Sequence, residues 1–234
     1  MSAPDITEAD IQAVSEVLRS GRLSLGPKQE KFEQLVAKRV GVSQAVAVSS
    51  GTAALHLLVR AFGLGPGDEV LVPSFTFAAS VNCLLYEGVT PVFVDIQPDT
   101  YNLDPRDLEA KITPRTRAVI PVDVFGHPAD WEEIEQLARK YGLAVIDDSC
   151  EALGALYRGH AVGSFGDAAT FAFYANKQIT TGEGGMIVTD NAQIADLCRS
   201  LRNQGRGRMG TWLLHEELGY NYRMDEMSAA LGVS

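Results

Sequence analysis

Short apolar segments alternate with amphipathic stretches along most of the chain. The apolar segments have the length of strands, whereas the stretches between them repeat apolar side chains every three or four residues, as helices do. One such stretch places five apolar side chains on a single helical face: Trp131, Ile134, Leu137, Ala138 and Tyr141. This alternation is typical of a parallel sheet that is covered by helices on both faces.

The pattern predicts seven strands, at residues 45–48, 69–72, 91–94, 118–122, 144–147, 169–173 and 185–189. It predicts helices between them at residues 52–62, 77–86, 104–111, 130–141 and 192–202. Two more helices, 7–18 and 27–40, precede the first strand, and a further helix opens at Asp225. We find no internal repeat and no interdomain linker, so we expect one α/β domain. Its sheet should be mostly parallel and seven-stranded, with helices on both faces.

The size and composition of the chain fit a soluble globular domain. The chain has 234 residues, of which 46% are hydrophobic and 21% are charged, as is usual for a protein with one packed core. Its formal net charge of -10 argues against nucleic acid as a partner, because phosphate backbones are bound by clustered Lys and Arg. The sequence shows neither a signal peptide nor an apolar run that could span a membrane. We therefore expect a cytoplasmic protein without a membrane partner.

Residues 49–55, Ser-Ser-Gly-Thr-Ala-Ala-Leu, follow the first predicted strand and open a helix. The unpaired N–H groups at a helix start, the positive end of the helix dipole and small hydroxyls together form a cradle for phosphate. An ordinary helix cap uses the same residue types, so this segment alone leaves both interpretations open.

Two adjacent acids, Asp147 and Asp148, end an apolar strand. Successive side chains of a strand point to opposite faces, so one acid faces the crevice in which open parallel sheets bind ligands. An acid there binds a metal, orients a ribose or pairs with a protonated pyridine nitrogen; otherwise it is a solvated strand end. The sequence has no His cluster and no paired cysteines, so a metal site is the weakest of these interpretations.

Lys177 follows an apolar strand and precedes the glycine-rich segment 182–185. Burying an ammonium is costly unless the group is paired or neutralised, and a lysine that forms an imine escapes that cost. A lysine that extends to solvent is the ordinary alternative. The flanking aromatic residues and the glycine-rich return favour a functional lysine. The aromatic and polar segment 218–224, taken alone, is equally compatible with a surface loop.

Six segments together resemble the sugar aminotransferases of the DegT/DnrJ/EryC1/StrS family, which are fold-type I enzymes that use pyridoxal 5'-phosphate (PLP). The segments are SSGTAAL, VPSFTFAAS, FVDI, VIDDSCEALGA, FYANKQITTGEGG and LGYNYRMDE, and the match runs in order from about residue 21 to the end. The resemblance implies that residues 1–234 form an N-terminal segment and the PLP-binding large domain of a homodimer, and that a smaller C-terminal domain is missing.

The resemblance also assigns roles to individual residues. Lys177 stands where the family carries the lysine that binds PLP covalently, and Asp148 stands where the family contacts the pyridine nitrogen. Phe77 takes the place of an aromatic residue that stacks on the cofactor ring. The phosphate-binding turn of the family is matched by Gly51, Thr52 and the backbone of Ala53.

Asn221 and Arg223 match a segment that reaches across a dimer interface towards the cofactor phosphate of the second subunit, and the resemblance leaves open which of them does so. Two positions depart from the family pattern. Glu151 stands where the family often has Gln or His near the phenolic oxygen of PLP, and Ala172 replaces a phosphate-binding Ser of many members. We therefore expect phosphate binding to depend more on the helix start at Thr52.

The implied reaction is the transfer of an amino group to a keto-sugar nucleotide, with glutamate as the donor by family analogy and with ping-pong kinetics. Related dehydratases carry His in place of the lysine, so Lys177 favours amino transfer. The alternatives are a sugar dehydratase that uses pyridoxamine phosphate (PMP), another fold-type I activity such as a desulfurase, and a non-catalytic regulatory relative that binds PLP. A decayed site is disfavoured because Lys177, Asp148 and Phe77 are all present.

Overall fold

The seven predicted strands form one sheet in the computed structural model, which describes residues 3–207 and 214–234. The strands are β1 (Gln44–Val48), β2 (Glu69–Pro73), β3 (Thr90–Val94), β4 (Thr116–Val119), β5 (Ala144–Asp148), β8 (Ala168–Ala172) and β9 (Gly185–Thr189). Strand β4 differs most from the prediction, since it ends at Val119, although the Ile120 N–H still donates to Leu71 O at 2.8 Å. A separate hairpin of β6 (Leu156–Tyr157) and β7 (His160–Ala161) was not predicted.

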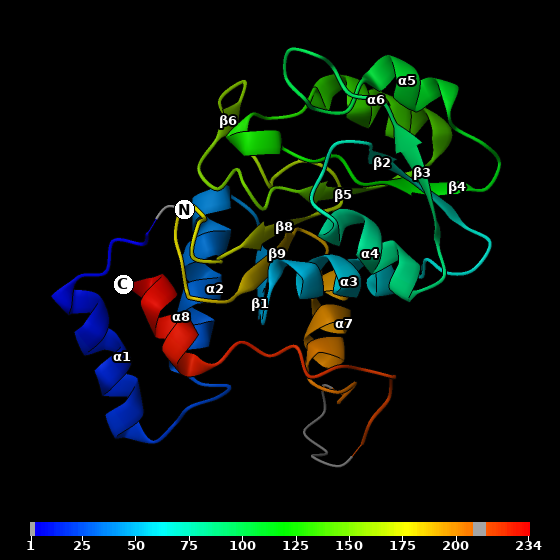
Figure 1. The fold of residues 1–234 in the computed structure, drawn as a ribbon. Helices are drawn as coiled ribbons and strands as arrows, with labels where there is room; N and C mark the ends of the chain where they lie inside the picture. The colour runs from blue at the N-terminus through cyan, green and yellow to red at the C-terminus, as the bar shows by residue number, and fades with distance from the viewer. Residues whose placement is uncertain (1–2, 208–213) are drawn as a thin grey trace.

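The strand order is β1-β9-β8-β5-β4-β2-β3. Strand β9 runs antiparallel to both of its neighbours, and the other neighbouring pairs are parallel. Gly185, the first residue of β9, pairs with Val48 and Ala172, the last residues of β1 and β8. The prediction of a mostly parallel sheet is confirmed, and the segments that follow the parallel strands lie at one edge, where β9 begins (Figure 1).

Helices cover both faces of the sheet (Figure 1). One face packs on α3 (Gly51–Ala61), α4 (Ala79–Tyr86) and α7 (Ala192–Arg202). The other face packs on α2 (Pro27–Val40), α8 (Glu226–Val233), α5 (Pro105–Ala110) and α6 (Trp131–Tyr141). Helix α1 (Glu8–Ser20) lies against α8, and a short 3-10 helix, η1 (Val124–Gly126), follows β4. Alternate residues of the strands contact the two sets of helices, as the two-residue period of a strand requires.

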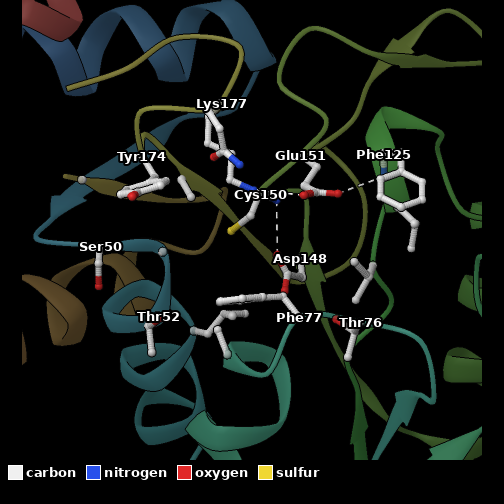
Figure 2. A pocket seen from close by; sticks show the side chains of 18 of the residues that line it. Ser50, Thr52, Thr76, Phe77, Phe125, Asp148, Cys150, Glu151, Tyr174 and Lys177 are labelled. Atoms are coloured by element: carbon white, nitrogen blue, oxygen red, sulfur yellow. Dashed lines mark hydrogen bonds and ion pairs between the residues drawn. The ribbon is translucent and has the colours of Figure 1, made fainter. Parts of the chain in front are cut away.

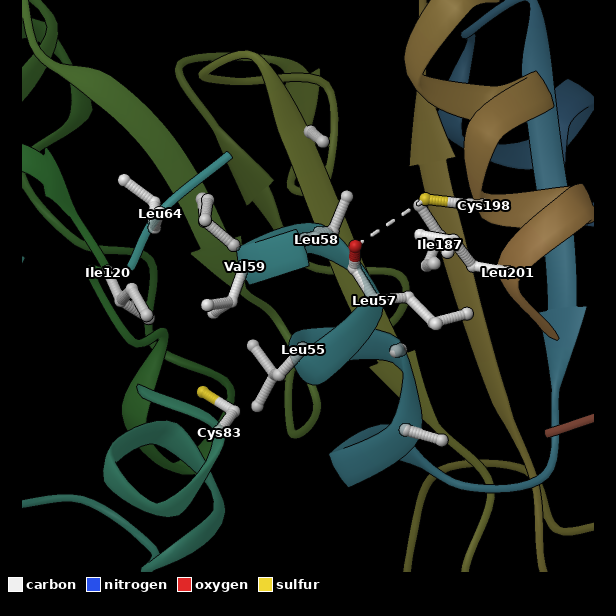
Figure 3. Packing of buried hydrophobic residues seen from close by; sticks show 14 of the residues in the cluster. Leu55, Leu57, Leu58, Val59, Leu64, Cys83, Ile120, Ile187, Cys198 and Leu201 are labelled. Atoms are coloured by element: carbon white, nitrogen blue, oxygen red, sulfur yellow. Dashed lines mark hydrogen bonds between the residues drawn. The ribbon is translucent and has the colours of Figure 1, made fainter. Parts of the chain in front are cut away.

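Helix α3 is buried along nearly its whole length. Figure 3 shows its side chains Leu55, Leu57 and Leu58 among residues of the sheet and of α7, and all three are buried. Burial of one leucine side chain contributes about 2 kcal/mol. This packing fixes the position of the helix whose first turn reaches the sheet edge.

Helices α2 and α8 are joined at their N-terminal ends by one carboxylate. Glu226 is only 1% exposed, and its two oxygens accept the N–H groups of Gly26, Lys28 and Gln29 at 3.0, 2.9 and 2.8 Å. A carboxylate at a helix start satisfies N–H groups that have no partner inside the helix. A side chain at Gly26 would overlap this carboxylate, which explains the glycine at that position.

Across residues 3–207 and 214–234, no helix combines the length and the apolar character that crossing a bilayer requires.

Candidate active site

A cavity of about 600 Å³ lies at the edge of the sheet where most of the strands end (Figure 2). Six of the residues predicted to bind a cofactor line it, namely Gly51, Thr52, Phe77, Asp148, Glu151 and Lys177. Three others do not contribute to its lining: Ala53, Asn221 and Arg223. The parallel topology therefore brings together residues that are distant in the sequence, because they lie at or after the ends of four strands of the same sheet, β1, β2, β5 and β8.

Lys177 lies in the turn after β8, where its N–H donates to Tyr174 O at 2.9 Å. Its side chain lines the cavity (Figure 2) and is only 16% exposed, so it does not extend into solvent. The Nζ atom lies 3.2 Å from Glu151 Oε1, and Glu151 Oε2 accepts the Phe125 N–H at 3.1 Å. The carboxylate of Glu151 thus stabilises an ammonium group that burial alone would disfavour.

Asp148 is held on the opposite side of the cavity floor by two hydrogen bonds. Its Oδ2 accepts the Ser80 hydroxyl at 2.6 Å, and its Oδ1 accepts the Cys150 N–H at 3.2 Å. The side chain of Asp147 bonds on the other face of the strand, as the alternation along β5 predicts.

Ser80 is a site residue that sequence reasoning missed. Its hydroxyl also lies 2.8 Å from Thr76 Oγ1. The contact with Thr76 therefore helps to orient the Ser80 hydroxyl that donates to Asp148. Nothing in the sequence distinguishes Ser80 from any other hydroxyl in an apolar helix. Its role becomes visible only when α4 is placed against the end of β5.

A buried network lies directly behind Asp148. Ser149 Oγ is 2.8 Å from Asp123 Oδ2 and 2.7 Å from Asp147 Oδ2. A hydroxyl carries a single proton, so both contacts are hydrogen bonds only when one of the two carboxyls is protonated. Asp123 Oδ1 accepts N–H groups of Ala129 and Trp131, whereas among the described residues Asp147 accepts only Gly163 N–H besides Ser149. Asp123, which accepts more hydrogen bonds, therefore carries the charge, and Asp147 carries the proton.

The pKa shifts agree with this assignment. Burial, reinforced by the nearby carboxyl of Asp123, raises the pKa of Asp147 well above its usual range. Burial also raises the pKa of Asp123, although the bonds from Ala129 N–H and the Ser149 hydroxyl limit the shift, and the result is about 6. Of the three neighbouring acids, Asp148 alone lines the cavity.

These shifts predict a pH dependence of stability. A carboxyl whose pKa is raised in the folded state binds more protons when folded than when unfolded, so its contribution is greatest at acid pH and is lost as the pH rises through about 6. We expect the free energy of unfolding to fall by roughly 2 kcal/mol for this reason between about pH 4 and pH 7. Asp123→Asn should reduce that slope, as measured by urea unfolding at several pH values. An unchanged slope would show that the pair does not titrate in this range.

The first turn of α3 forms one wall of the cavity. Ser50 caps the helix, and its hydroxyl accepts the Ala53 N–H at 3.1 Å. The Ala53 amide, which was predicted to bind phosphate, donates to the cap in this structure, and Gly51 and Thr52 are the residues of the first turn that line the cavity. A side chain at Gly51 would meet Ala172 Cβ at 2.8 Å. The start of α3 can therefore lie this close to the end of β8 only because both residues are small.

Aromatic side chains surround the opening of the cavity. Phe77 precedes α4 and does not lie in its first turn as the sequence pattern predicted; it is 79% exposed and lines the cavity. Phe75 lies with its ring 6.0 Å from that of Phe125, and Tyr174 lines the cavity beside Lys177 (Figure 2). Phe125 and Tyr174 were not predicted as site residues, because neither belongs to a pattern of its own.

Asn221 and Arg223 lie beside β1 and α7. Arg223 forms a bridge with Val48, and its Nη1 donates to Asn203 Oδ1 at 3.0 Å. Asn221 pairs with Asn203 through the backbone, and its side chain is exposed. Within one chain, therefore, the structure does not bring this segment to the cavity.

The sequence and structure match one family of proteins. A family model described as the DegT/DnrJ/EryC1/StrS aminotransferase family matches residues 4–234. The chain belongs to this family. The resemblance carried by the six sequence segments is thereby confirmed.

Individual relatives agree with the family. GDP-perosamine synthase of Escherichia coli O157:H7 is 44% identical over 233 residues, which are 99% of this chain and 64% of that protein. An aminotransferase from Psychrobacter cryohalolentis superposes with a TM-score of 0.96 at 35% identity, over 99% of this chain and 62% of the other. Spr1654 from Streptococcus pneumoniae, a proposed sugar aminotransferase in its PLP form, superposes with a TM-score of 0.92 at 34% identity, over 99% and 64%. The chain thus spans less than two thirds of each relative.

The groups that line the cavity fit PLP, which carries an aldehyde, a phosphate and a protonatable nitrogen on one ring. Lys177 supplies an amine for the aldehyde, and Asp148 supplies a buried carboxylate for the nitrogen. The exposed face of Phe77 suits an aromatic ring, and the start of α3 suits a phosphate.

Proposed function

We propose that the chain is the PLP-binding part of a cytoplasmic aminotransferase that moves an amino group from glutamate to a keto-sugar nucleotide. In this proposal, residues 1–234 form the N-terminal segment and the large domain, and a smaller C-terminal domain completes the protein. The family assignment supports amino transfer, and the similarity to a GDP-perosamine synthase supports a nucleotide-linked sugar. One observation carries the proposal: the side chains of Lys177 and Asp148 line the same cavity.

The residues of the cavity divide the work of the reaction. PLP supplies an electron sink for the bond that breaks at the substrate carbon. Lys177 would hold the cofactor through its Nζ atom, and the same amine, when free, would accept and return a proton. Asp148 keeps the ring nitrogen protonated, because a neighbouring carboxylate favours the cationic form. Phe77 would cover the ring, and the helix start at Thr52 would hold the phosphate.

Glu151 holds Lys177 in place before the cofactor binds. Its carboxylate joins the Lys177 ammonium on one side and the Phe125 N–H on the other. The lysine therefore approaches the cofactor from a defined direction, which reduces the entropy lost when the covalent bond forms.

In this proposal the protein is a homodimer, and Asn221 is the residue that reaches the cofactor phosphate of the second subunit. The guanidinium of Arg223 is occupied by Asn203 of its own chain. The Asn221 side chain is exposed, and in the described parts of the chain it makes no hydrogen bond. An exposed amide is free to donate to a phosphate oxygen.

A visible absorption spectrum before and after the addition of glutamate tests the proposal. We expect the band of the lysine-bound cofactor to disappear and the band of its amine form to replace it. Subsequent addition of a keto-sugar nucleotide should restore the first band. If glutamate leaves the spectrum of the PLP-loaded protein unchanged, amino transfer from glutamate is excluded. A PMP-dependent dehydratase is disfavoured by Lys177, since related dehydratases carry His there.

A further inference from the structure

A buried histidine, His56, lies on the second turn of α3. His56 is only 4% exposed, and both of its ring nitrogens have partners. Nε2 lies 2.7 Å from Glu87 Oε1, and Nδ1 lies 3.1 Å from the hydroxyl of Tyr222. Glu87 follows α4, and its Oε1 also accepts the Tyr220 hydroxyl at 3.0 Å. His56 thus joins two helices to the segment that contains Asn221.

The charge on Glu87 fixes the direction of these bonds. Burial alone would raise the pKa of Glu87, but the bonds from His56 and Tyr220, together with Arg60, hold it below its usual value. Burial and the bond to Glu87 raise the pKa of Tyr220 to about 12, so its hydroxyl remains a donor. With Glu87 ionised, His56 donates from Nε2, and its Nδ1 bonds to the Tyr222 hydroxyl.

Tyr220 and Tyr222 fix the direction of the side chain of Asn221, which lies between them in the sequence. Their rings stack with centroids 4.9 Å apart and planes 10° apart, and both rings contact the ring of His56. The backbone between them is extended along the end of α7, since Tyr220 N–H donates to Leu201 O at 2.6 Å and Tyr222 N–H donates to Arg202 O at 3.0 Å. In an extended segment alternate side chains point to opposite sides. With both tyrosines directed at His56, Asn221 must face away from it.

We propose that His56 and Glu87 are positioning residues that fix the direction of Asn221, so that this amide contacts the cofactor phosphate of a second copy of the chain. The inference rests on the proposed function, because it takes PLP as the ligand and a homodimer as the assembly. It adds that the same helix serves both subunits. The first turn of α3 faces the phosphate site of its own chain. The next turn carries His56, which fixes the direction of Asn221, the residue that this chain contributes to the phosphate site of the second subunit.

The test measures the dissociation constant of PLP by titration of the cofactor-free protein, together with the thermal midpoint and the sedimentation of each variant. Asn221→Ala should weaken PLP binding about tenfold, the amount expected for a hydrogen bond to a charged group. The double variant Tyr220→Phe/Tyr222→Phe keeps both rings and removes the two hydroxyls that bond to His56 and Glu87. It should weaken PLP binding about fivefold, since Asn221 is then free to turn.

Two matched variants complete the design. Tyr86→Phe removes a hydroxyl from a third ring that contacts His56, and this hydroxyl makes no hydrogen bond among the described residues, so PLP binding should be unchanged. His56→Gln can keep the bonds to Glu87 and Tyr222, because a glutamine amide both donates and accepts. It should bind PLP more tightly than His56→Ala, whose smaller side chain opens a buried cavity.

The decisive comparison combines the tyrosine changes with Asn221→Ala. If the tyrosines act through Asn221, the triple variant binds PLP no more weakly than Asn221→Ala alone. Additive losses would overturn the inference, as would an Asn221→Ala protein that binds PLP normally; both outcomes leave the aminotransferase proposal intact if glutamate still converts the cofactor. A wild-type protein that does not bind PLP overturns the inference and the proposed function together.

Discussion

Lys177→Ala is expected to abolish the visible absorbance of the lysine-bound cofactor and to lower turnover by at least about a thousandfold. The reason is that one amine both anchors the cofactor and moves the proton. Its position in the cavity, 3.2 Å from Glu151, leaves no second amine to replace it among the residues that line this cavity. The measurement is the absorption spectrum of the PLP-loaded variant, followed by a steady-state assay with glutamate.

Lys111→Ala is the matched control for this experiment. Lys111 ends α5 on the surface and pairs with Asp107, so its loss should leave both the absorbance and the turnover unchanged. A Lys177→Ala protein that keeps the absorbance of the lysine-bound cofactor would exclude Lys177 as the anchor.

Asp148→Asn is expected to lower turnover about a hundredfold, whereas Asp147→Asn lowers it less than about fivefold. Asp148 supplies the negative charge that keeps the ring nitrogen protonated, and a neutral amide removes that charge. Asp147 faces the other side of β5 and carries the proton of the buried network, so a neutral amide resembles the side chain it replaces. Steady-state kinetics of the two variants, with thermal midpoints to confirm folding, make the comparison.

The paired design separates two explanations. If Asp147→Asn proves the more damaging change although the variant is folded, the assignment of the two strand faces to their roles is wrong. Equal losses in both variants would instead show that the buried network affects turnover as strongly as the charge that lines the cavity.

Local patterns in the sequence were sufficient for most of the fold. Helices at residues 27–40 and 192–202 match α2 and α7 to the residue, because caps and apolar periodicity are local signals. The alternation along β5 also predicted that Asp147 and Asp148 point to opposite faces. The β6–β7 hairpin was missed because strands of two residues are too short to show a period.

Contacts between distant segments set the limits of prediction for the site. Ser80 binds Asp148 across 68 residues of sequence, and His56 meets Tyr222 across 166 residues. No local pattern encodes such pairs, so neither Ser80 nor His56 could be assigned a role in advance. The cap bond of Ala53 is a further example, since the residues that start a helix do not reveal which of its amides the cap takes.

A crystal structure of the protein grown with PLP tests most directly whether one cavity holds the reactive groups of a PLP enzyme. We expect a covalent bond from Lys177 Nζ to the cofactor and an Asp148 carboxylate oxygen about 2.8 Å from the ring nitrogen of the same molecule. A cofactor bound to a different lysine, or a ring nitrogen that faces away from Asp148, would contradict it.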